Sequence, residues 1–304
     1  MQIGTSQFYD TGASQLAKLS AKSDTLNTQI ATTKKFTDPS ADVVAYNRLS
    51  TIKQANADSK AYDGNVTLAK SLLTQSDSTL TAINTQLQQA AELTTQAATG
   101  TLSDANRKII ATQLQGIRDE LVSLAGTKDA RGQPLFGAAT GTSAVTQGAD
   151  GTVSFGGTGE VSAIPVADGI NIQATDSAQR VFGNIPTSDG GTTDAFALLS
   201  NFISALNAGG DVSKASATAA DGLTSAQTQV SAVQGSVGAR AARLDIVSSQ
   251  STDAAGAREL DRSALEDTDL SSAIAELQKT MTVLSATQAS FTKLGSLSLF
   301  DYMK

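Results

Sequence analysis

Two long stretches of the chain contain no proline and carry apolar residues at helical spacing. The first covers residues 40–133 and the second covers residues 187–304. Proline breaks the interior of a helix, so both stretches are free to form long helices. The four prolines of the chain are Pro39, Pro134, Pro165 and Pro186.

In the first stretch, apolar and small residues recur at spacings of three and four over about eight heptads, which is a coiled-coil-like pattern. It predicts a helix from about residue 41 to 98, roughly 85 Å long at 1.5 Å per residue. One set of seam positions is Ala45, Ile52, Ser59, Val66, Leu73, Leu80, Leu87 and Thr94, and its companion set is Ala55, Tyr62, Ala69, Ser76, Ile83, Ala90 and Ala97.

Shorter helices flank this seam. Gly100 is predicted to end the long helix, and Ser103 to cap the start of the next one, because its hydroxyl can accept from a free backbone N–H. The apolar face of that next helix is Ile110, Leu114, Ile117, Leu121 and Leu124. An amphipathic stretch before Pro39 carries Leu16, Leu19, Leu26 and Ile30.

The second proline-free stretch repeats this organisation. A short helix around Phe196 to Leu206 is predicted to end at Gly209-Gly210, and two long apolar seams follow it. The first seam is Leu223, Ala226, Val230, Val233, Val237, Leu244, Val247 and Leu265. The second, in the last helix, is Leu270, Ile274, Leu277, Met281, Leu284, Gln288, Phe291 and Leu294.

The segment between the helical ends has a different character. Residues 137–191 hold eleven of the 25 glycines, and short β-branched runs alternate with turn signals. The strand candidates are Thr152–Phe155, Val161–Val166 and Ile170–Ala174. We therefore predict a mainly α fold with an inserted small β domain, in which N- and C-terminal coiled-coil-like helices form an elongated rod.

This pattern divides the chain into five parts. We expect a terminal helix at each end, rod helices inside them and a variable β-rich domain in the middle. Many seam positions are Ala, Ser or Thr and bury little area, so the terminal segments are expected to order only on assembly. The boundaries are 1–38, 39–136, 137–193, 194–265 and 266–304.

The amino-acid composition excludes most classes of catalytic site. The chain has no His, no Cys and no Trp, which excludes the common triads, thiol nucleophiles and zinc sites. Carboxylates in the β-like region are the remaining acid–base candidates, and most stand beside turn glycines or Ser, where Asp is expected for backbone reasons. They are Asp150, Glu160, Asp168 and Asp176. We predict no catalytic, cofactor-binding or metal site.

One further motif, "GSVGARAARLD" at Gly235–Asp245, could hold an anion through Arg240 and Arg243. Close helix packing with flanking surface charge is the favoured interpretation. The net charge of −7 and the pI of about 4.7 would repel a nucleic acid.

Targeting signals are also informative. No run of 18 apolar residues indicates a membrane span, and the start lacks the basic and apolar regions of a secretory signal peptide. The absence of Cys is compatible with an exported chain. We therefore expect no membrane partner, and export without a cleaved signal remains open.

Several longer motifs lie at the ends. They include "MQIGTSQFYDTGASQLAKLSAKSDTLNTQIATTKKFTDPS", "LTTQAATGTLSDANRKIIATQL", "LAGTKDARGQPLFGA" and "LSSAIAELQKTMTVLSATQASFTKLGSLSLFDYM". Together they resemble the flagellar hook-associated protein 3 family, the hook–filament junction proteins related to flagellin. The "SLSLFDYM" terminus favours this family over plain flagellins. Two departures stand out: Thr33 occupies a position that is usually Gly, and Pro134 one that is commonly aromatic.

The resemblance implies a structural, non-enzymatic protein of the extracellular bacterial flagellum, secreted unfolded through the flagellar type III apparatus. It implies that 1–38 and 266–304 form an inner tube while 137–193 faces outward. The implied partners are copies of the same chain, hook-associated protein 1, flagellin and a cytoplasmic export chaperone. No cofactor is implied.

On this basis the apolar residues of both terminal segments are the candidate assembly interface. One alternative is a flagellin that forms the filament itself. A remote alternative is a secreted enzyme or carbohydrate-binding module in the middle domain, against which the scarcity of aromatic rings argues. The candidate interface residues are Phe8, Leu16, Leu19, Leu26, Ile30, Leu277, Met281, Leu284, Phe291, Leu294, Leu297, Leu299 and Phe300.

Overall fold

The structure is a computed structural model that describes every residue except 1, 101, 150, 160, 188–189 and 303–304. The side chains of residues 2–6, 8 and 294–302 also lie outside the description. The fold is mainly α with small inserted β elements, as the sequence predicts. The helices are α1 (Gln2–Thr32), α2 (Val43–Ala97), α3 (Asp104–Ala125), α4 (Ala178–Phe182), α5 (Ala195–Ala208), α6 (Ser213–Glu266) and α7 (Leu270–Tyr302).

The chain forms two compact units. One unit combines residues 1–58 with residues 253–304, and the other is residues 59–252. Helices α2 and α6 each contribute to both units, because the boundaries fall at residues 58/59 and 252/253 inside them.

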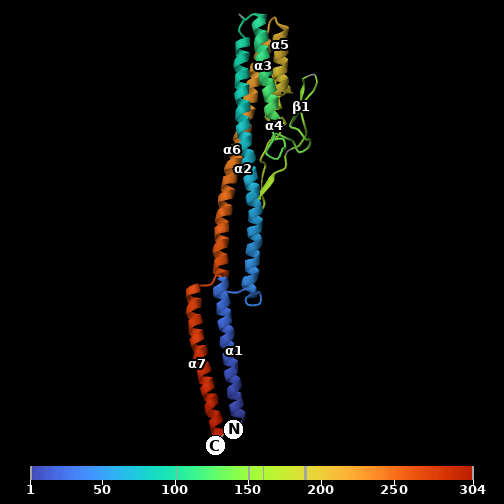
Figure 1. Cartoon of the computed structure of the whole chain (residues 1–304). Coiled ribbons are helices and arrows are strands. Elements are labelled where there is room, and N and C mark those ends of the chain that lie inside the picture. The colour runs from blue at the N-terminus through green and yellow to red at the C-terminus, as the bar shows by residue number, and fades with distance from the viewer. Residues whose placement is uncertain (1, 101, 150, 160, 188–189, 303–304) are drawn as a thin grey trace. The chain divides into compact units, whose positions relative to one another are not determined.

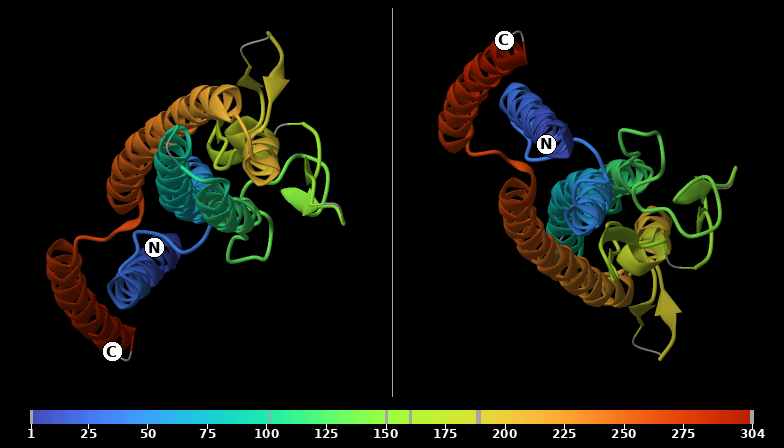
Figure 2. Two further views of the ribbon diagram at one scale, coloured as in Figure 1. Left: turned by 90° about the horizontal axis from the view of Figure 1, so that it is seen from above. Right: turned by 90° about the horizontal axis from the view of Figure 1, so that it is seen from below.

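In the unit built from the chain ends, α1 and α7 lie side by side (Figures 1 and 2). They run antiparallel. Near the end of α1, the Thr33 carbonyl accepts a hydrogen bond of 2.9 Å from the backbone N–H of Thr268, just before α7. Toward the other end of the pair, Gly12 of α1 lies against the ring of Phe291 of α7.

The predicted seams of the two long helices are confirmed. In α2, the residues from Val66 to Ala97 at seam positions are buried, among them Leu80, Ile83 and Leu87 with no exposed surface. In α6, the seam from Leu223 to Val247 is buried as well. The core of the larger unit therefore follows the heptad pattern of both helices.

Helices α3 and α5 pack closely on each other and complete the helical part of the larger unit. The predicted cap at Ser103 is confirmed, since its hydroxyl accepts from the N–H of Asn106 at 3.3 Å. Helix α5 ends at Ala208 and is capped by Gly209, which has φ of 73°, as the glycine pair predicts. Helix α2 ends at Ala97, which confirms the predicted end at about residue 98, although Gly100 lies three residues beyond that end.

The described β elements form three separate antiparallel hairpins, which lie to one side of the helices of this unit (Figure 1). The β3–β4 hairpin turns at Gly169, which has φ of 67°. The predicted strands are real but shorter than expected, and the partner of β2 was not predicted. The pairs are β1 (Val145–Gln147) with β2 (Val153–Phe155), β3 (Ile164–Ala167) with β4 (Ile170–Ile172), and β5 (Ile185–Pro186) with β6 (Thr192–Thr193).

Glycines in the first hairpin region let two backbone segments approach closely. A Cβ on Gly141 would lie 1.9 Å from the carbonyl oxygen of Gly156, and a Cβ on Gly157 would lie 1.7 Å from that of Thr140. The N–H of Gly156 donates to the Ala144 carbonyl at 2.9 Å. These glycines thus allow the two backbone segments to pair.

Candidate assembly surface

The contact between α1 and α7 follows one heptad seam on each helix. Along each seam the less exposed residues alternate at spacings of four and three, which keeps them on one side of the helix. Thr280 and Ala273 are the most buried residues of the α7 seam, at 3% and 6% exposed. The seams are Gly12, Leu16, Leu19, Ser23, Leu26 and Ile30 on α1, and Ala273, Leu277, Thr280, Leu284, Thr287 and Phe291 on α7.

An aromatic contact lies along the pair, away from the connections. The ring of Tyr9 meets the ring of Phe291 edge-on, with centroids 5.4 Å apart and planes at 89°. A Cβ on Gly12 would lie 2.8 Å from an edge carbon of the Phe291 ring. Gly12 is therefore the place on α1 where a bulky ring of α7 can approach the backbone.

One ion pair crosses the seam. Lys22 Nζ donates to Glu276 Oε1 at 2.5 Å, and both side chains are largely exposed. The lysine holds the pKa of Glu276 below its ordinary value through this hydrogen bond and through its charge. Exposed pairs of this kind stabilise a fold little, so the pair adds little to the stability of the two helices.

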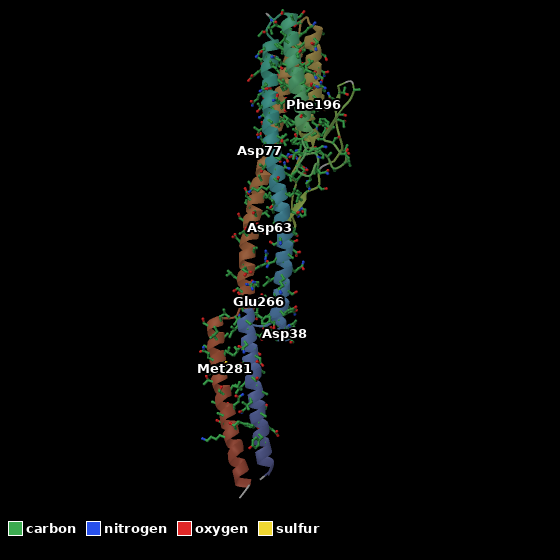
Figure 3. All side chains as sticks on the ribbon, in the orientation of Figure 1. Asp38, Asp63, Asp77, Phe196, Glu266 and Met281 are labelled. Carbon is green, nitrogen blue, oxygen red and sulfur yellow. The ribbon has the colours of Figure 1, made fainter. Side chains whose placement is uncertain are left out.

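Apolar side chains on α7 flank the seam and remain exposed. Leu270, Ile274 and Met281 lie on one flank, and Val283 lies on the other, as the helical period of 3.6 residues requires. Met281 is 54% exposed and Ile274 is 43% exposed. Figure 3 labels Met281 on α7. In the described part of α1, by contrast, no large apolar side chain is exposed.

The structure separates the predicted interface residues into three groups. Leu26 is buried, and six other predicted interface residues are half-buried along the α1–α7 seam. The fold therefore brings these seven residues together within one chain. Met281 is exposed on the flank. The half-buried residues are Leu16, Leu19, Ile30, Leu277, Leu284 and Phe291. The side chains of Phe8, Leu294, Leu297, Leu299 and Phe300 lie outside the described residues.

Several exposed apolar residues were not among the predicted interface residues. Val43 and Val44 at the start of α2 are 60% and 72% exposed, and Leu260 on α6 is 73% exposed. No local pattern marks these residues as exposed, since the consecutive apolar residues Leu72 and Leu73 of the same helix α2 are both buried. Ile274 and Leu270 belong to the predicted stripe of the last helix, but their neighbours Ala273 and Thr280 take the buried positions.

The carboxylate candidates of the β region do not form a catalytic group in the described residues. Asp176 is 1% exposed and is paired with Arg240 of α6 and with Arg180, whose Nη1 lies 3.1 Å from its Oδ1. Arg240 also donates to the Gln173 carbonyl at 2.6 Å. Asp168 lies exposed in the β3–β4 turn. Asp150 and Glu160 lie outside the described residues.

The structure corrects the packing interpretation of the motif at Gly235–Asp245, because Gly235 and Gly238 are exposed and nothing lies within 4 Å of a built Cβ on either. Arg240 is not a flanking surface charge but anchors the β region to α6 through the buried Asp176. The described rings of the middle region are also structural, since Phe182 and Phe155 pack near Phe196, with centroids 4.9 Å and 6.4 Å away. Figure 3 labels Phe196 beside the hairpins.

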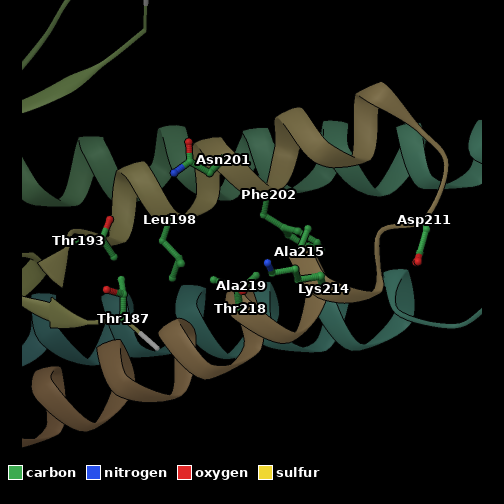
Figure 4. Close-up of a pocket in the computed structure, with 10 residues that line it drawn as sticks. All are labelled: Thr187, Thr193, Leu198, Asn201, Phe202, Asp211, Lys214, Ala215, Thr218 and Ala219. Carbon is green, nitrogen blue, oxygen red and sulfur yellow. The ribbon is translucent and has the colours of Figure 1, made fainter. Parts of the chain in front are cut away.

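The larger unit contains a cavity of about 440 Å³ between α5, α6 and the β5–β6 hairpin (Figure 4). Its walls include Leu198 and Phe202, and Lys214 reaches into it. No group of His, Cys, Asp or Glu in the described part of the chain has the arrangement of a metal site. None of the described helices is both long and apolar enough to cross a membrane.

Paired helices from the two chain ends, with an insertion of small β elements between them, define a flagellin-like protein. The family model for the bacterial flagellin N-terminal helical region matches residues 3–140. Two solved structures share the fold. One is a flagellar hook-associated protein of Vibrio parahaemolyticus (TM-score 0.65, 20% identity, 75% of this chain and 98% of that chain). The other is the flagellar junction protein FlgL of Legionella pneumophila (TM-score 0.60, 16% identity, 72% of this chain and all of that chain).

A curated relative makes the assignment narrower. The chain is 30% identical over 316 residues to flagellar hook-associated protein 3 of Salmonella typhimurium, and the alignment covers 99% of each protein. The chain belongs to the flagellar hook-associated protein 3 family, whose members are structural proteins of the flagellar hook–filament junction.

Proposed function

We propose that this chain connects the flagellar hook to the flagellin filament by assembling through its terminal helices. In this proposal its partners are copies of itself, hook-associated protein 1 on one side and flagellin on the other. A cytoplasmic chaperone covers the terminal helices before the chain is secreted unfolded to the cell exterior. The protein has no catalytic role.

The observation that carries the proposal is the asymmetry between α7 and α1. Exposed apolar side chains in water are unfavourable unless they meet a partner, at about 25 cal/mol per Å² of buried apolar surface. Helix α7 exposes Ile274 and Met281 on one flank and Val283 on the other, while the described part of α1 exposes none. A helix that is apolar on both flanks of its seam suits a position between two neighbouring subunits.

The proposal assigns a role to each part of the chain. Residues 1–38 and 266–304 form the inner tube, residues 39–136 and 194–265 form the rod around it, and residues 137–193 face outward. The small seam residues of the terminal pair, such as Ser23, Ala273 and Thr280, support this role. They bury little apolar area within one chain, so neighbouring subunits have to supply the rest.

The test is a pair of charge substitutions on the exposed flank. Ile274→Asp combined with Met281→Asp should prevent filament attachment in cells while leaving the helical content of the purified chain unchanged, because neither side chain is buried in one chain. Ser285→Asp is the matched control, since Ser285 is an exposed polar residue of α7. Normal filaments in the double variant, or equal loss in the control, would contradict the proposal.

A further inference from the structure

The two connections that lead into and out of the α1–α7 pair are joined to each other. The N–H of Lys35 donates to the Glu266 carbonyl at 2.7 Å, and the N–H of Thr268 donates to the Thr33 carbonyl at 2.9 Å. These bonds form an antiparallel bridge around Lys34 and Asp267. Residues from opposite ends of the sequence thus form one short ladder, here called the clasp, of residues 33–35 and 266–268.

Side chains reinforce the clasp with a charge network. Lys34 Nζ lies 2.5 Å from Glu266 Oε1, and the Glu266 side chain is only 8% exposed. Arg262 of α6 donates to Glu266 at 3.1 Å and to Asp267 at 3.0 Å. The third partner of Arg262 is Glu259, one helical turn earlier, at 2.8 Å. Figure 3 labels Glu266 at this place.

Both helix ends beside the clasp depend on it. Lys35 Nζ donates to the Ala264 carbonyl at 2.6 Å, which satisfies one of the free carbonyls in the last turn of α6. Gln29 in the last turn of α1 donates to the Lys35 carbonyl at 2.6 Å. On the other side, Asp269 accepts from the backbone of Ser271 and Ser272 and caps α7. The clasp therefore links α1, α6 and the start of α7.

The network combines three acidic side chains with four basic ones, so it carries a small positive excess. The acids are Glu259, Glu266 and Asp267, and the bases are Lys34, Lys35 and Arg262, with Lys53 of α2 acting on Glu266 through its charge. A buried carboxylate that loses its cationic partner is strongly destabilised, so the network closes only when its members are all in place. Backbone bonds alone, two in number, would hold such a connection weakly.

We infer that the clasp is an electrostatic lock that holds the α1–α7 pair to the adjoining end of α6, and that it opens without unfolding the larger unit when its charges are screened or removed. Opening frees residues 36–42 and 267–269 as flexible joints, so that the helix pair can change direction as one body. This device does not rest on the proposed function, because it concerns the purified single chain.

Hydrogen exchange measured by mass spectrometry tests the lock directly on the full chain. Peptides that contain the amides of Lys35 and Thr268 report the two bonds of the clasp. In Glu266→Gln their exchange should rise about tenfold or more, as expected when a buried charged partner is lost. In the unchanged chain, 1 M salt should produce part of the same rise, because it shortens the screening length to about 3 Å. Peptides of α3 and α5 should not change.

Glu276→Gln is the matched control, since Glu276 makes an exposed ion pair in the same unit. Its effect on the two clasp amides should stay below about twofold. If Glu266→Gln lowers the total helix content, Arg262→Lys replaces it, because lysine keeps the charge but cannot reach three acids at once. Unchanged exchange of Lys35 and Thr268 in the variant used, or an equal rise in the control, overturns the inference.

Discussion

The Phe291 ring of α7 lies directly against Gly12 of α1, where a Cβ would come within 2.8 Å of the ring. Tyr9 packs edge-on against the same ring at 5.4 Å. This contact joins the two ends of the chain some way from the clasp, so the α1–α7 pair is fixed at two separate points along its length. A change at Gly12 should therefore act on the pairing of the helices, and not only on α1 itself.

Gly12→Val should destabilise the helix pair by about 1–3 kcal/mol, because the new side chain displaces the ring. Gly64→Val is the control: Gly64 is also helical but has nothing within 4 Å of a built Cβ, so the change there should be near neutral. Hydrogen exchange in α1 and α7 measures the effect. Equal changes in hydrogen exchange in the two variants would show that the packing of the Phe291 ring does not depend on Gly12.

Asp176→Asn should cost about 3–5 kcal/mol in the free energy of unfolding, because it leaves the partly buried Arg240 without its anionic partner. Proteolysis should then cut the segment 137–193 faster, since Asp176 anchors it to α6. Asp168→Asn changes an exposed turn residue of the same region and should have little effect. Equal rates of cleavage in both variants would argue against the anchor.

Thr33 has φ of 59°, a conformation that a β-branched residue adopts only with strain. Thr33→Gly should therefore stabilise the unit of the chain ends by about 1 kcal/mol. Asn184 has the same φ, but asparagine adopts this conformation more readily, so Asn184→Gly should add little stability. Thermal melting of both variants measures these changes in stability. A loss of stability in Thr33→Gly would show that the backbone of the threonine is not strained.

Acid should weaken the clasp. Lys34, followed by Arg262, lowers the pKa of Glu266 below its ordinary 4.5 against the opposing effect of burial. The Ser263 hydroxyl and Arg262 lower the pKa of Asp267 below 3.8. Carboxyls with lowered pKa stabilise the fold above their unfolded values, and this contribution is lost as the pH falls through the lowered folded values.

The unit of the chain ends should therefore lose stability progressively between about pH 5 and pH 2. Thermal melting followed by the helical signal across this range measures it, and Glu266→Gln should show a shallower dependence. A chain whose melting temperature rises as the pH falls through this range would contradict the sign of these shifts.

The parts of the fold with a sustained period could be predicted from the sequence. The heptads of α2 and α6 repeat often enough to define both seams, and the buried residues Leu80 and Leu223 lie on them as expected. The cap at Ser103 and the helix end at Gly209 follow from local backbone chemistry, which depends on few neighbours.

The division of the last helix into a seam and exposed flanks could not be predicted. A stripe chosen by hydrophobicity selects Ile274 and Met281, but the small Ala273 and Thr280 occupy the buried positions, because they let α1 approach closely. The clasp could not be predicted from the sequence either. Lys35 and Glu266 meet although they stand at opposite ends of the chain, and no local pattern specifies such a pair.

The most direct test of the junction role is to remove this chain from its bacterium and to examine the cells by electron microscopy. We expect hooks without filaments, and flagellin subunits released into the medium, because flagellin is still exported but has nothing to attach to. Cells that carry normal filaments without this chain would contradict the junction role. Cells that lack both filaments and released flagellin would show instead that the chain is the filament subunit itself.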